Sequence, residues 1–317
     1  TDVTLICKPE QSKIIEKKGI TIEGQRGKQN IPLKTNTQLD KIYDLVILAT
    51  KTQSIEDFVR GNINFLKDTL ILTTQNGLAA ERILQKYIEV KNIFSSIVMF
   101  GATYEEAGQA IHNFEGDWII GKIENPNDNK LQELSKILGK SFKITISSNI
   151  KGQKWTKVFL NMNNCLPAAL GLSMQEVFSD LNICQISIQL WQEALNLIDA
   201  AGIKLESLPT FSIEKLHGLC NMPIAESTRV FSGIMTNLSK TPVYGSILQS
   251  IKRGRPSEID YINGEIIELA KSLNKVSPLN KKLTDLVHEV EKNNKFFTKN
   301  ELLAQIRNLS ATELRRI

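Results

Sequence analysis

The apolar residues of this chain change their spacing once, close to residue 147. Up to about residue 146 they form short β-branched runs separated by helical patterns, an alternation that is typical of an α/β domain. The run over 45–49 is apolar on both faces, as a central parallel strand covered by helices would be. We therefore expect a doubly wound, Rossmann-like sheet over residues 1–147. Its expected strands lie at 3–6, 20–22, 45–49, 70–74, 93–100, 118–120 and 142–146, and its expected helices near 9–17, 53–66, 78–87 and 128–138.

From residue 148 onward the strand signal disappears and helical periodicity continues to the end. We expect an all-helical second domain over residues 148–317, because 317 residues are enough for two domains with separate cores. Gly202, Pro209 and Pro223 fall where helices should break. The expected helices lie near 149–170, 183–202, 212–221, 240–253, 258–273, 279–293 and 299–309.

The composition excludes several classes of protein. With 41% hydrophobic and 23% charged residues, the chain is an ordinary globular sequence and not a disordered one. It has no apolar run near the ~18 to 20 residues of a membrane helix and no secretory signal, so we expect a cytoplasmic protein without a membrane partner. The four cysteines lack CxxC or CxxH spacing, so we expect packed thiols and no metal site. The net charge of +5 is dispersed and lacks interleaved aromatic residues, which favours small anionic ligands over nucleic acid.

The first residues bear on cofactor selection. The run over 3–6, followed by Lys8, resembles the second strand of a dinucleotide-binding unit, where the residue after the strand meets the adenosine ribose. A basic residue there favours NADP over NAD, although a lysine at this place could also be a plain surface residue. The phosphate-binding pattern GxGxxG is missing, because the segment GQRG at 24–27 does not follow a strand and open a helix in the needed way.

Several further segments together resemble the ketopantoate reductase (2-dehydropantoate 2-reductase) family over nearly the whole chain. They are DLVILATK at 44–51, TQNGL at 74–78, WTKVFLN at 155–161, and SILQ at 246–249 leading to RPSEIDYING at 255–264. The resemblance implies an NADPH-binding domain followed by a helical domain. It also implies an NADP-dependent oxidoreductase that reduces ketopantoate to pantoate on the route to pantothenate and coenzyme A.

The resemblance assigns Lys157 as the catalytic lysine and Asn161 as a substrate-holding residue. The two side chains are four residues apart on a predicted helix, so they project from one face and can contact the same small molecule. A desolvated lysine can polarise a ketone and donate the proton that the alkoxide needs once hydride arrives. Taken alone, Lys157 could equally be a solvated helix lysine.

The resemblance also places Glu258, Ser246, Asn76 and Lys51 at the site. Glu258 follows a proline in the first turn of a predicted helix, where the macrodipole favours a carboxylate that can accept from the substrate hydroxyl and keep Lys157 charged. Ser246 is a hydroxyl donor suited to the substrate carboxylate. Asn76 and Lys51 follow predicted strands, at the edge where cofactor and substrate bind in α/β sheets. Each of these residues alone could be a turn, cap or surface residue.

One position departs from the family pattern. Cys165 stands four residues after Asn161, where the family commonly has a second asparagine, and cysteine is a poor partner for a substrate hydroxyl. The neighbouring Asn164 lies about 100° around the helix and cannot simply replace it. A related reductase for another branched 2-oxo acid therefore stays open. So does a cofactor-free regulatory or binding protein derived from this family. We expect a monomer or homodimer.

A second departure leads to a prediction about the start of the chain. The opening strand, glycine turn and first helix of a dinucleotide-binding unit are not found before the run over 3–6. We expect the natural polypeptide to extend about 20 to 25 residues upstream with a strand followed by GxGxxG, since pyrophosphate needs close backbone approach and free helix N–H groups. The 317-residue chain alone should then bind NADPH poorly or not at all in a calorimetric titration. Micromolar binding would show that the strand assignment at 3–6 is wrong.

Overall fold

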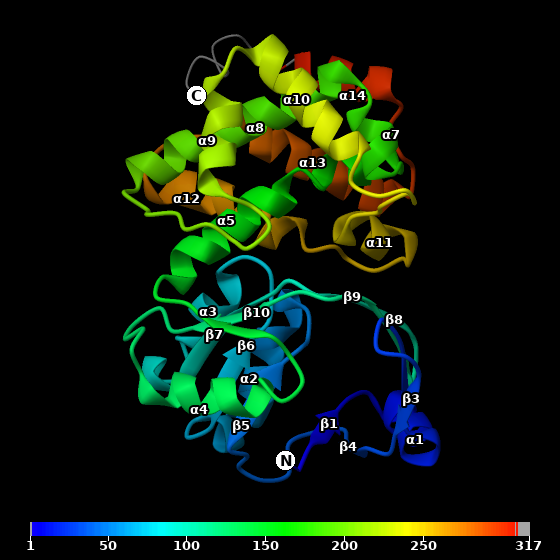
Figure 1. Cartoon of the computed structure of the whole chain (residues 1–317), viewed down its shortest axis with the longest axis vertical. Coiled ribbons are helices and arrows are strands. Elements are labelled where there is room, and N and C mark those ends of the chain that lie inside the picture. The colour runs from blue at the N-terminus through cyan, green and yellow to red at the C-terminus, as the bar shows by residue number, and fades with distance from the viewer. Residues whose placement is uncertain (1, 308, 310–317) are drawn as a thin grey trace. The chain divides into compact units, whose positions relative to one another are not determined.

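The computed structural model describes residues 2–307 and 309 (Figure 1). Contacts between residues divide the chain into two units. The first comprises Thr1–Gln75 and Ala80–Ile150, and the second comprises Asn76–Ala79 and Lys151–Ile317. Four residues from the N-terminal half, those of the loop Asn76–Ala79, therefore group with the C-terminal half.

A five-stranded sheet is the centre of the first unit. Its order is β11-β10-β7-β6-β5, and its strands are β5 (Leu45–Leu48), β6 (Leu70–Thr73), β7 (Ile93–Val98), β10 (Trp118–Gly121) and β11 (Ile144–Ile146). Consecutive residues of β6 point to opposite faces: Ile71 packs in the core with α2 (Ile55–Leu66), and Leu72 packs with α4 (Asn129–Leu138). Helices thus cover both faces, which explains why the central strands are apolar on both sides.

The sheet is mixed, whereas the sequence predicted a parallel, doubly wound one. Strands β5, β6 and β7 run parallel, but β10 is antiparallel to β7. The hairpin of β8 (Gly101–Glu106) and β9 (Gln109–Phe114) joins β7 to β10 in place of a crossover helix. A parallel neighbour requires a crossover connection, so the strand that follows this hairpin returns antiparallel.

The remaining strands of the first unit form two smaller sheets, so the runs predicted over 3–6 and 20–22 are strands, but they do not belong to the doubly wound sheet in which they were expected. Strand β1 (Thr4–Ile6) precedes helix α1 (Pro9–Lys18) and pairs in parallel with β4 (Lys34–Asn36). Strands β2 (Ile20–Gly24) and β3 (Gln29–Ile31) join β9 and β8 in a sheet of order β3-β2-β9-β8. The segment 24–27 is the turn of the β2–β3 hairpin, which explains why no helix follows its glycines. Three short elements complete this unit: α3 (Ala79–Leu84) and the 3₁₀ turns η1 (Thr52–Ser54) and η2 (Val90–Asn92).

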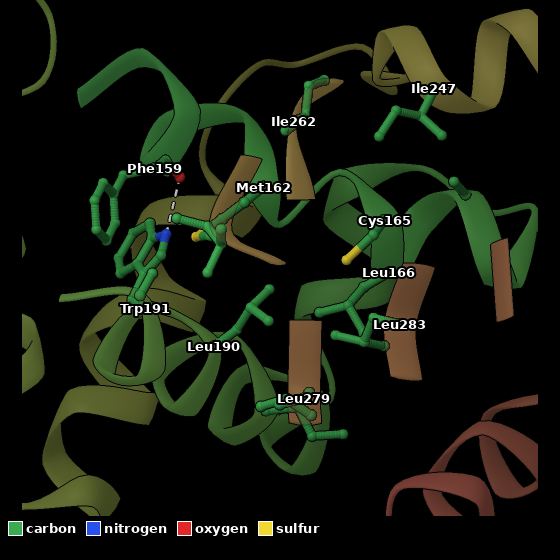
Figure 2. Close-up of a cluster of buried hydrophobic side chains, with 14 of the residues drawn as sticks. Phe159, Met162, Cys165, Leu166, Leu190, Trp191, Ile247, Ile262, Leu279 and Leu283 are labelled. Atoms are coloured by element: carbon green, nitrogen blue, oxygen red, sulfur yellow. Dashed lines mark hydrogen bonds between the residues drawn. The ribbon is translucent and has the colours of Figure 1, made fainter. Parts of the chain in front are cut away.

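The regular elements described in the second unit are all helices. They are α5 (Ile150–Met162), α6 (Cys165–Leu170), α7 (Met174–Phe178), α8 (Leu181–Ala200), α9 (Ile213–Asn221), α10 (Ile224–Thr236), α11 (Ser246–Lys252), η3 (Ile259–Tyr261), α12 (Asn263–Ser272), α13 (Pro278–Asn293) and α14 (Lys299–Arg307). The long helix α8 lies in the core, where the Trp191 indole N–H donates to the carbonyl of Phe159 at 2.9 Å (Figure 2). This bond satisfies the polar end of a large buried aromatic side chain.

The helical prediction differs from the structure at several places. The helix expected over 149–170 is two helices, because the chain turns at Asn163 and Asn164. Helices α7 and α10 were not predicted, and residue 308, near the end of the helix expected over 299–309, lies outside the described residues. In the described part of the chain, no helix combines the length and apolar character needed to cross a membrane.

A hydrogen-bond network around a buried carboxylate connects four helices of the second unit. Glu193 of α8 is 1% exposed, and it accepts the backbone N–H groups of Leu279 and Asn280, both at 2.9 Å, in the first turn of α13. The side-chain amide of Asn280 also donates to Glu193 at 2.8 Å and accepts from Asn263 Nδ2 at 3.2 Å. The Asn263 amide further donates to the carbonyl of Met162, the last residue of α5. Burial raises the pKa of Glu193, although these donors act in the opposite direction.

Candidate active site

Helix α5 presents Lys157 and Asn161 on one face, as their four-residue spacing predicts. Burial lowers the pKa of Lys157 from its usual 10.5 to about 8, because desolvation disfavours the ammonium form. The Asn161 side-chain amide donates to Oδ1 of Asn76 at 3.2 Å. Two of the residues that the sequence assigned to substrate, 85 positions apart, are therefore in direct contact.

The loop that carries Asn76 is anchored by the residues that follow it. Gly77 has φ +73°, and a Cβ at this position would lie 2.0 Å from the carbonyl oxygen of Tyr261, so only glycine fits here. The backbone N–H of Leu78 donates to Oε1 of Glu265 at 2.9 Å, and Glu265 is 2% exposed. These contacts hold Asn76 against the second unit and next to α5. The motif TQNGL is thus an anchor as well as a turn.

Glu258 is partly buried and immediately precedes the three-residue 3₁₀ turn η3. The helix predicted from residue 258 instead begins at Asn263, as α12. The expectation that a helix macrodipole stabilises the Glu258 carboxylate is therefore wrong, since a single 3₁₀ turn aligns too few peptide dipoles. The segment around Glu258 is held by side chains of α13 instead.

His288 of α13 connects that helix to the segment containing Glu258. Its Nε2 lies 2.9 Å from Asp260 Oδ1, and its Nδ1 lies 2.9 Å from Glu291 Oε2. Glu291 also accepts the backbone N–H of Ser257 at 2.8 Å. Residues Ser257 and Asp260, on either side of Glu258 and Ile259, are therefore both bonded to α13. Burial alone lowers the pKa of His288, but its bonds to Asp260 and Glu291 outweigh that effect and raise it.

His288 and Glu265 support the candidate site but were not predicted from the sequence. The i, i+3 spacing of His288 and Glu291, typical of helix neighbours, is the local signal for that pair. Their partners Asp260 and Leu78 lie far along the chain, and only the fold brings them together.

Cys165, the residue that departs from the family pattern, is not accessible to a small molecule. Its side chain is fully buried and points into the core between α6 and α13, near Leu166 and Leu283 (Figure 2). Burial raises its pKa to about 12, so the thiol is neutral. Its polar neighbour is the side-chain amide of Asn263, with Nδ2 3.8 Å from Sγ. All four cysteines of the chain are free thiols.

Ser246 is the first residue of α11 and is exposed, as a group that receives a ligand must be. In the first unit, the exposed Lys8 follows β1 and immediately precedes α1, while the partly buried Lys51 follows β5 and precedes η1. These two lysines thus occupy the carboxyl ends of parallel strands, as predicted from the sequence.

The carboxyl ends of β5 and β6 are bound to each other. Gln75 Nε2 donates to the carbonyls of Leu48 and Thr50, both at 2.8 Å, and the Thr74 hydroxyl donates to the Leu48 carbonyl at 2.7 Å. This cross-link fixes the backbone just before Lys51. Across residues 2–307, no group of three His, Cys, Asp or Glu side chains is arranged to hold a metal ion.

Comparison with known proteins adds to this geometry. The family model Ketopantoate reductase PanE/ApbA matches residues 1–125, and the model of its C-terminal part matches residues 149–291. The chain is 30% identical to the 2-dehydropantoate 2-reductase of Pyrococcus horikoshii over 298 residues, covering 92% of this chain and 90% of that protein. It is 27% identical to the enzyme of the same name from Lactococcus lactis, with the same two coverages.

Two solved structures have the same fold. D-mandelate dehydrogenase, solved with NADH and anilino(oxo)acetate, aligns with a TM-score of 0.79 at 23% identity over 92% of each chain. A PanE/ApbA family ketopantoate reductase from Ralstonia eutropha aligns with a TM-score of 0.77 at 22% identity, covering 92% of this chain and 91% of that one. At these identities, the similarity shows only a shared fold, an α/β unit followed by a helical unit.

The His288 contacts predict a pH-dependent contribution to stability. A histidine whose pKa is raised by folding stabilises fully below its unfolded pKa of ~6.5, and this contribution is lost as the pH rises through the folded pKa. Because the side chain is 42% exposed, we expect less than about 1 kcal/mol. Urea unfolding of the protein and of His288→Gln, from pH 5.5 to 8.5, should give free energies that differ at acidic pH and converge at alkaline pH. His217→Gln, a histidine change on α9, is the control. A difference that is constant with pH would contradict the prediction.

Proposed function

Because the chain belongs to the ketopantoate reductase family of oxidoreductases, we propose that it reduces ketopantoate (2-dehydropantoate) to pantoate with NADPH. The observation that carries this proposal is the environment of Lys157, whose pKa is lowered to about 8 on the helix face that also holds Asn161. A partly buried lysine with a perturbed pKa, on the same helix face as an amide side chain, is suited to polarise and protonate the oxygen of a small ketone.

An anionic dinucleotide matches the side chains at the strand ends of the first unit. Lys8 and Lys51 follow parallel strands at their carboxyl ends, where α/β sheets bind ligands, and lysine is a good partner for phosphate. We assign Lys8 to the 2′-phosphate of the adenosine ribose, and Lys51 and Asn76 to the nicotinamide end. Residues 2–307 include no glycine-rich turn between a strand and a helix, so the pyrophosphate is assigned no residue here. When bound, NADPH supplies the hydride that reduces the oxo carbon.

Lys157 supplies the proton in this proposal. At neutral pH a lysine with a pKa of about 8 is mostly protonated, so its ammonium can donate a hydrogen bond to the oxo oxygen of the substrate. As negative charge develops on that oxygen, the ammonium transfers one proton to it and becomes a neutral amine. The transfer is easier from this lysine than from an ordinary one, because its pKa is closer to the working pH.

The other residues position the substrate. The bond from Asn161 Nδ2 to Asn76 Oδ1 fixes the orientation of both amides and leaves the Asn161 oxygen and the Asn76 amino group available. Glu258, on the segment held by α13, accepts a hydrogen bond from the substrate hydroxyl, and the Ser246 hydroxyl donates to the substrate carboxylate. A branched 2-oxo acid other than ketopantoate is the alternative substrate, and steady-state assays across 2-oxo acids separate the two. Absence of reductase activity towards all of them would instead favour a binding protein.

The first prediction from this proposal concerns Lys157. Assayed in a form of the protein that binds NADPH, Lys157→Ala should lower the rate of ketopantoate reduction by ~100-fold or more, the scale of a lost general acid, with little change in NADPH affinity. In the unaltered enzyme, kcat/KM should fall above about pH 8, as the lysine loses its proton. Lys151→Ala removes an exposed lysine from the same helix and should have no such effect. Unchanged turnover in Lys157→Ala would exclude this lysine from the mechanism.

The second prediction concerns cofactor choice. In a form of the protein that binds NADPH, replacing Lys8 by Asp should weaken NADPH binding by ~1.5 to 3 kcal/mol, the scale of a charge-assisted hydrogen bond, and should reduce the preference for NADPH over NADH. Lys13→Asp makes the same charge change at an exposed site on α1 and serves as the control. Fluorescence titration with both dinucleotides measures the two affinities. Equal NADPH affinity in the Lys8 and Lys13 variants would mean that Lys8 is only a surface residue.

A further inference from the structure

Both ring nitrogens of His288 lie against carboxylates. Nε2 is 2.9 Å from Asp260 on the η3 segment, which we define as residues 257–261, and Nδ1 is 2.9 Å from Glu291 on α13 itself. A neutral imidazole has one N–H donor, whereas the imidazolium has two, and an ionised carboxylate only accepts. Both contacts are therefore hydrogen bonds only while His288 is protonated. The η3 segment is joined to α13 at Asp260 by a bond that depends on this proton.

Loss of the proton should break the bond to Asp260 and keep the one to Glu291. The Glu291 side chain is 19% exposed and also accepts the backbone N–H of Ser257, so it has little access to water. The Asp260 side chain is 58% exposed, so water can replace the imidazole there at little cost. A neutral His288 then keeps its proton on Nδ1 and presents the lone pair of Nε2 to a carboxylate oxygen, which is repulsive.

The η3 segment provides two contacts of the candidate site. Glu258 lies two residues before Asp260, and its carbonyl accepts the backbone N–H of Tyr261 at 3.0 Å. The carbonyl oxygen of Tyr261 is in turn the atom against which Gly77 packs, next to Asn76. Asp260 and Tyr261 belong to the same 3₁₀ turn, so a displacement of Asp260 also moves the carbonyl that receives the loop.

We propose that protonated His288 is a positioning residue for the candidate site and that loss of its proton weakens substrate binding. His288 acts without touching the substrate, because its bond to Asp260 fixes the segment that holds Glu258 and the loop containing Asn76. Binding of the 2-oxo acid is then tighter at acidic than at alkaline pH, separately from the effect of Lys157 on proton transfer. This inference rests on the proposed function, which assigns Glu258 and Asn76 to the substrate.

The charged groups around His288 set the pH at which this change occurs. Burial lowers the pKa of His288, but Asp260 and Glu291 outweigh that effect and raise it, so the ring loses its proton above the unfolded value of ~6.5. The exposed Lys292, one turn further along α13, is screened by water. Helices α6, α8 and α12 also pack against α13. The charged side chains of these helices and of the preceding α13 turn that the structure shows bonded elsewhere are Glu193, bonded to the first turn of α13, Glu265, bonded to Leu78, Glu268, paired with Lys271, and Asp285, paired with Lys281.

Hydrogen–deuterium exchange of the 317-residue chain tests the coupling without cofactor or substrate. Relative to the unfolded peptide, the η3 segment should exchange about two- to fivefold faster at pH 8.5 than at pH 6, the scale of a partly exposed ion pair. His288→Gln cannot carry a charge and should exchange at the faster rate at both pH values. His217→Gln, on α9, is the matched control and should behave as the unaltered protein. The same pH response in His288→Gln would overturn the inference.

Steady-state kinetics, in a form of the protein that binds NADPH, tests the consequence for substrate. The KM for ketopantoate should rise about two- to fivefold as the pH passes through the pKa of His288, with kcat changed less. In His288→Gln, KM should stay at the higher level throughout, while the fall in kcat/KM above about pH 8 that Lys157 causes remains. Asp260→Asn removes one of the two charges that keep the proton on His288, so the rise in KM should move to lower pH.

The outcomes separate this inference from the proposed function. An active enzyme whose KM has the same pH dependence with and without His288 overturns this inference alone, because His288 would then be structural only. A protein that reduces no 2-oxo acid overturns the proposed function and, with it, the assignment of His288 to substrate binding. In that case the exchange experiment still decides whether the proton on His288 fixes the η3 segment.

Discussion

The burial of one carboxylate, that of Glu193, organises the helical unit and through it the candidate site. A charged or polar group without partners is costly inside a core, so the Glu193 carboxylate is stable there only while the first turn of α13 supplies N–H groups to it. The same network continues through Asn280 and Asn263 to the carbonyl of Met162, which ends the helix carrying Lys157. The position of α13 is therefore coupled to the end of α5, and α13 also carries His288, which holds the Glu258 segment.

Apolar periodicity in the sequence was sufficient to predict most of the fold. The strands β5, β6 and β10 and the helices α2, α4, α8 and α13 lie within a few residues of their predicted ranges, because each has a buried face that repeats regularly. Strands β3 and β4 escaped prediction because they are three residues long and largely polar. Strand β9 has exposed residues at both ends, and its pairing with β2 depends on contacts about 90 positions apart.

The site was predictable where its chemistry follows local spacing and not where it depends on the fold. Lys157 and Asn161 are helix neighbours, so their shared face could be derived from the numbers alone. The sequence pattern could not reveal that the helix is interrupted after Met162, and this interruption turns Cys165 into the core while Asn164 stays accessible. The environment of Glu258 was misjudged for a related reason, because a short 3₁₀ turn replaces the first turn of the predicted helix.

The glycine at position 77 has a consequence for how the chain can be divided. Only glycine fits at position 77, next to the carbonyl oxygen of Tyr261, and the backbone N–H of Leu78 donates to Glu265. The loop Asn76–Ala79 therefore belongs to the helical unit, while the residues on both sides of it belong to the α/β unit. The backbone thus passes from one unit to the other at residues 75/76, 79/80 and 150/151. A cut between the two halves of the sequence would separate a helical fragment from four of its own residues, Asn76 among them. Evolutionary exchange of either half for that of a distant relative would face the same constraint, since the inserted loop and its docking surface must change together.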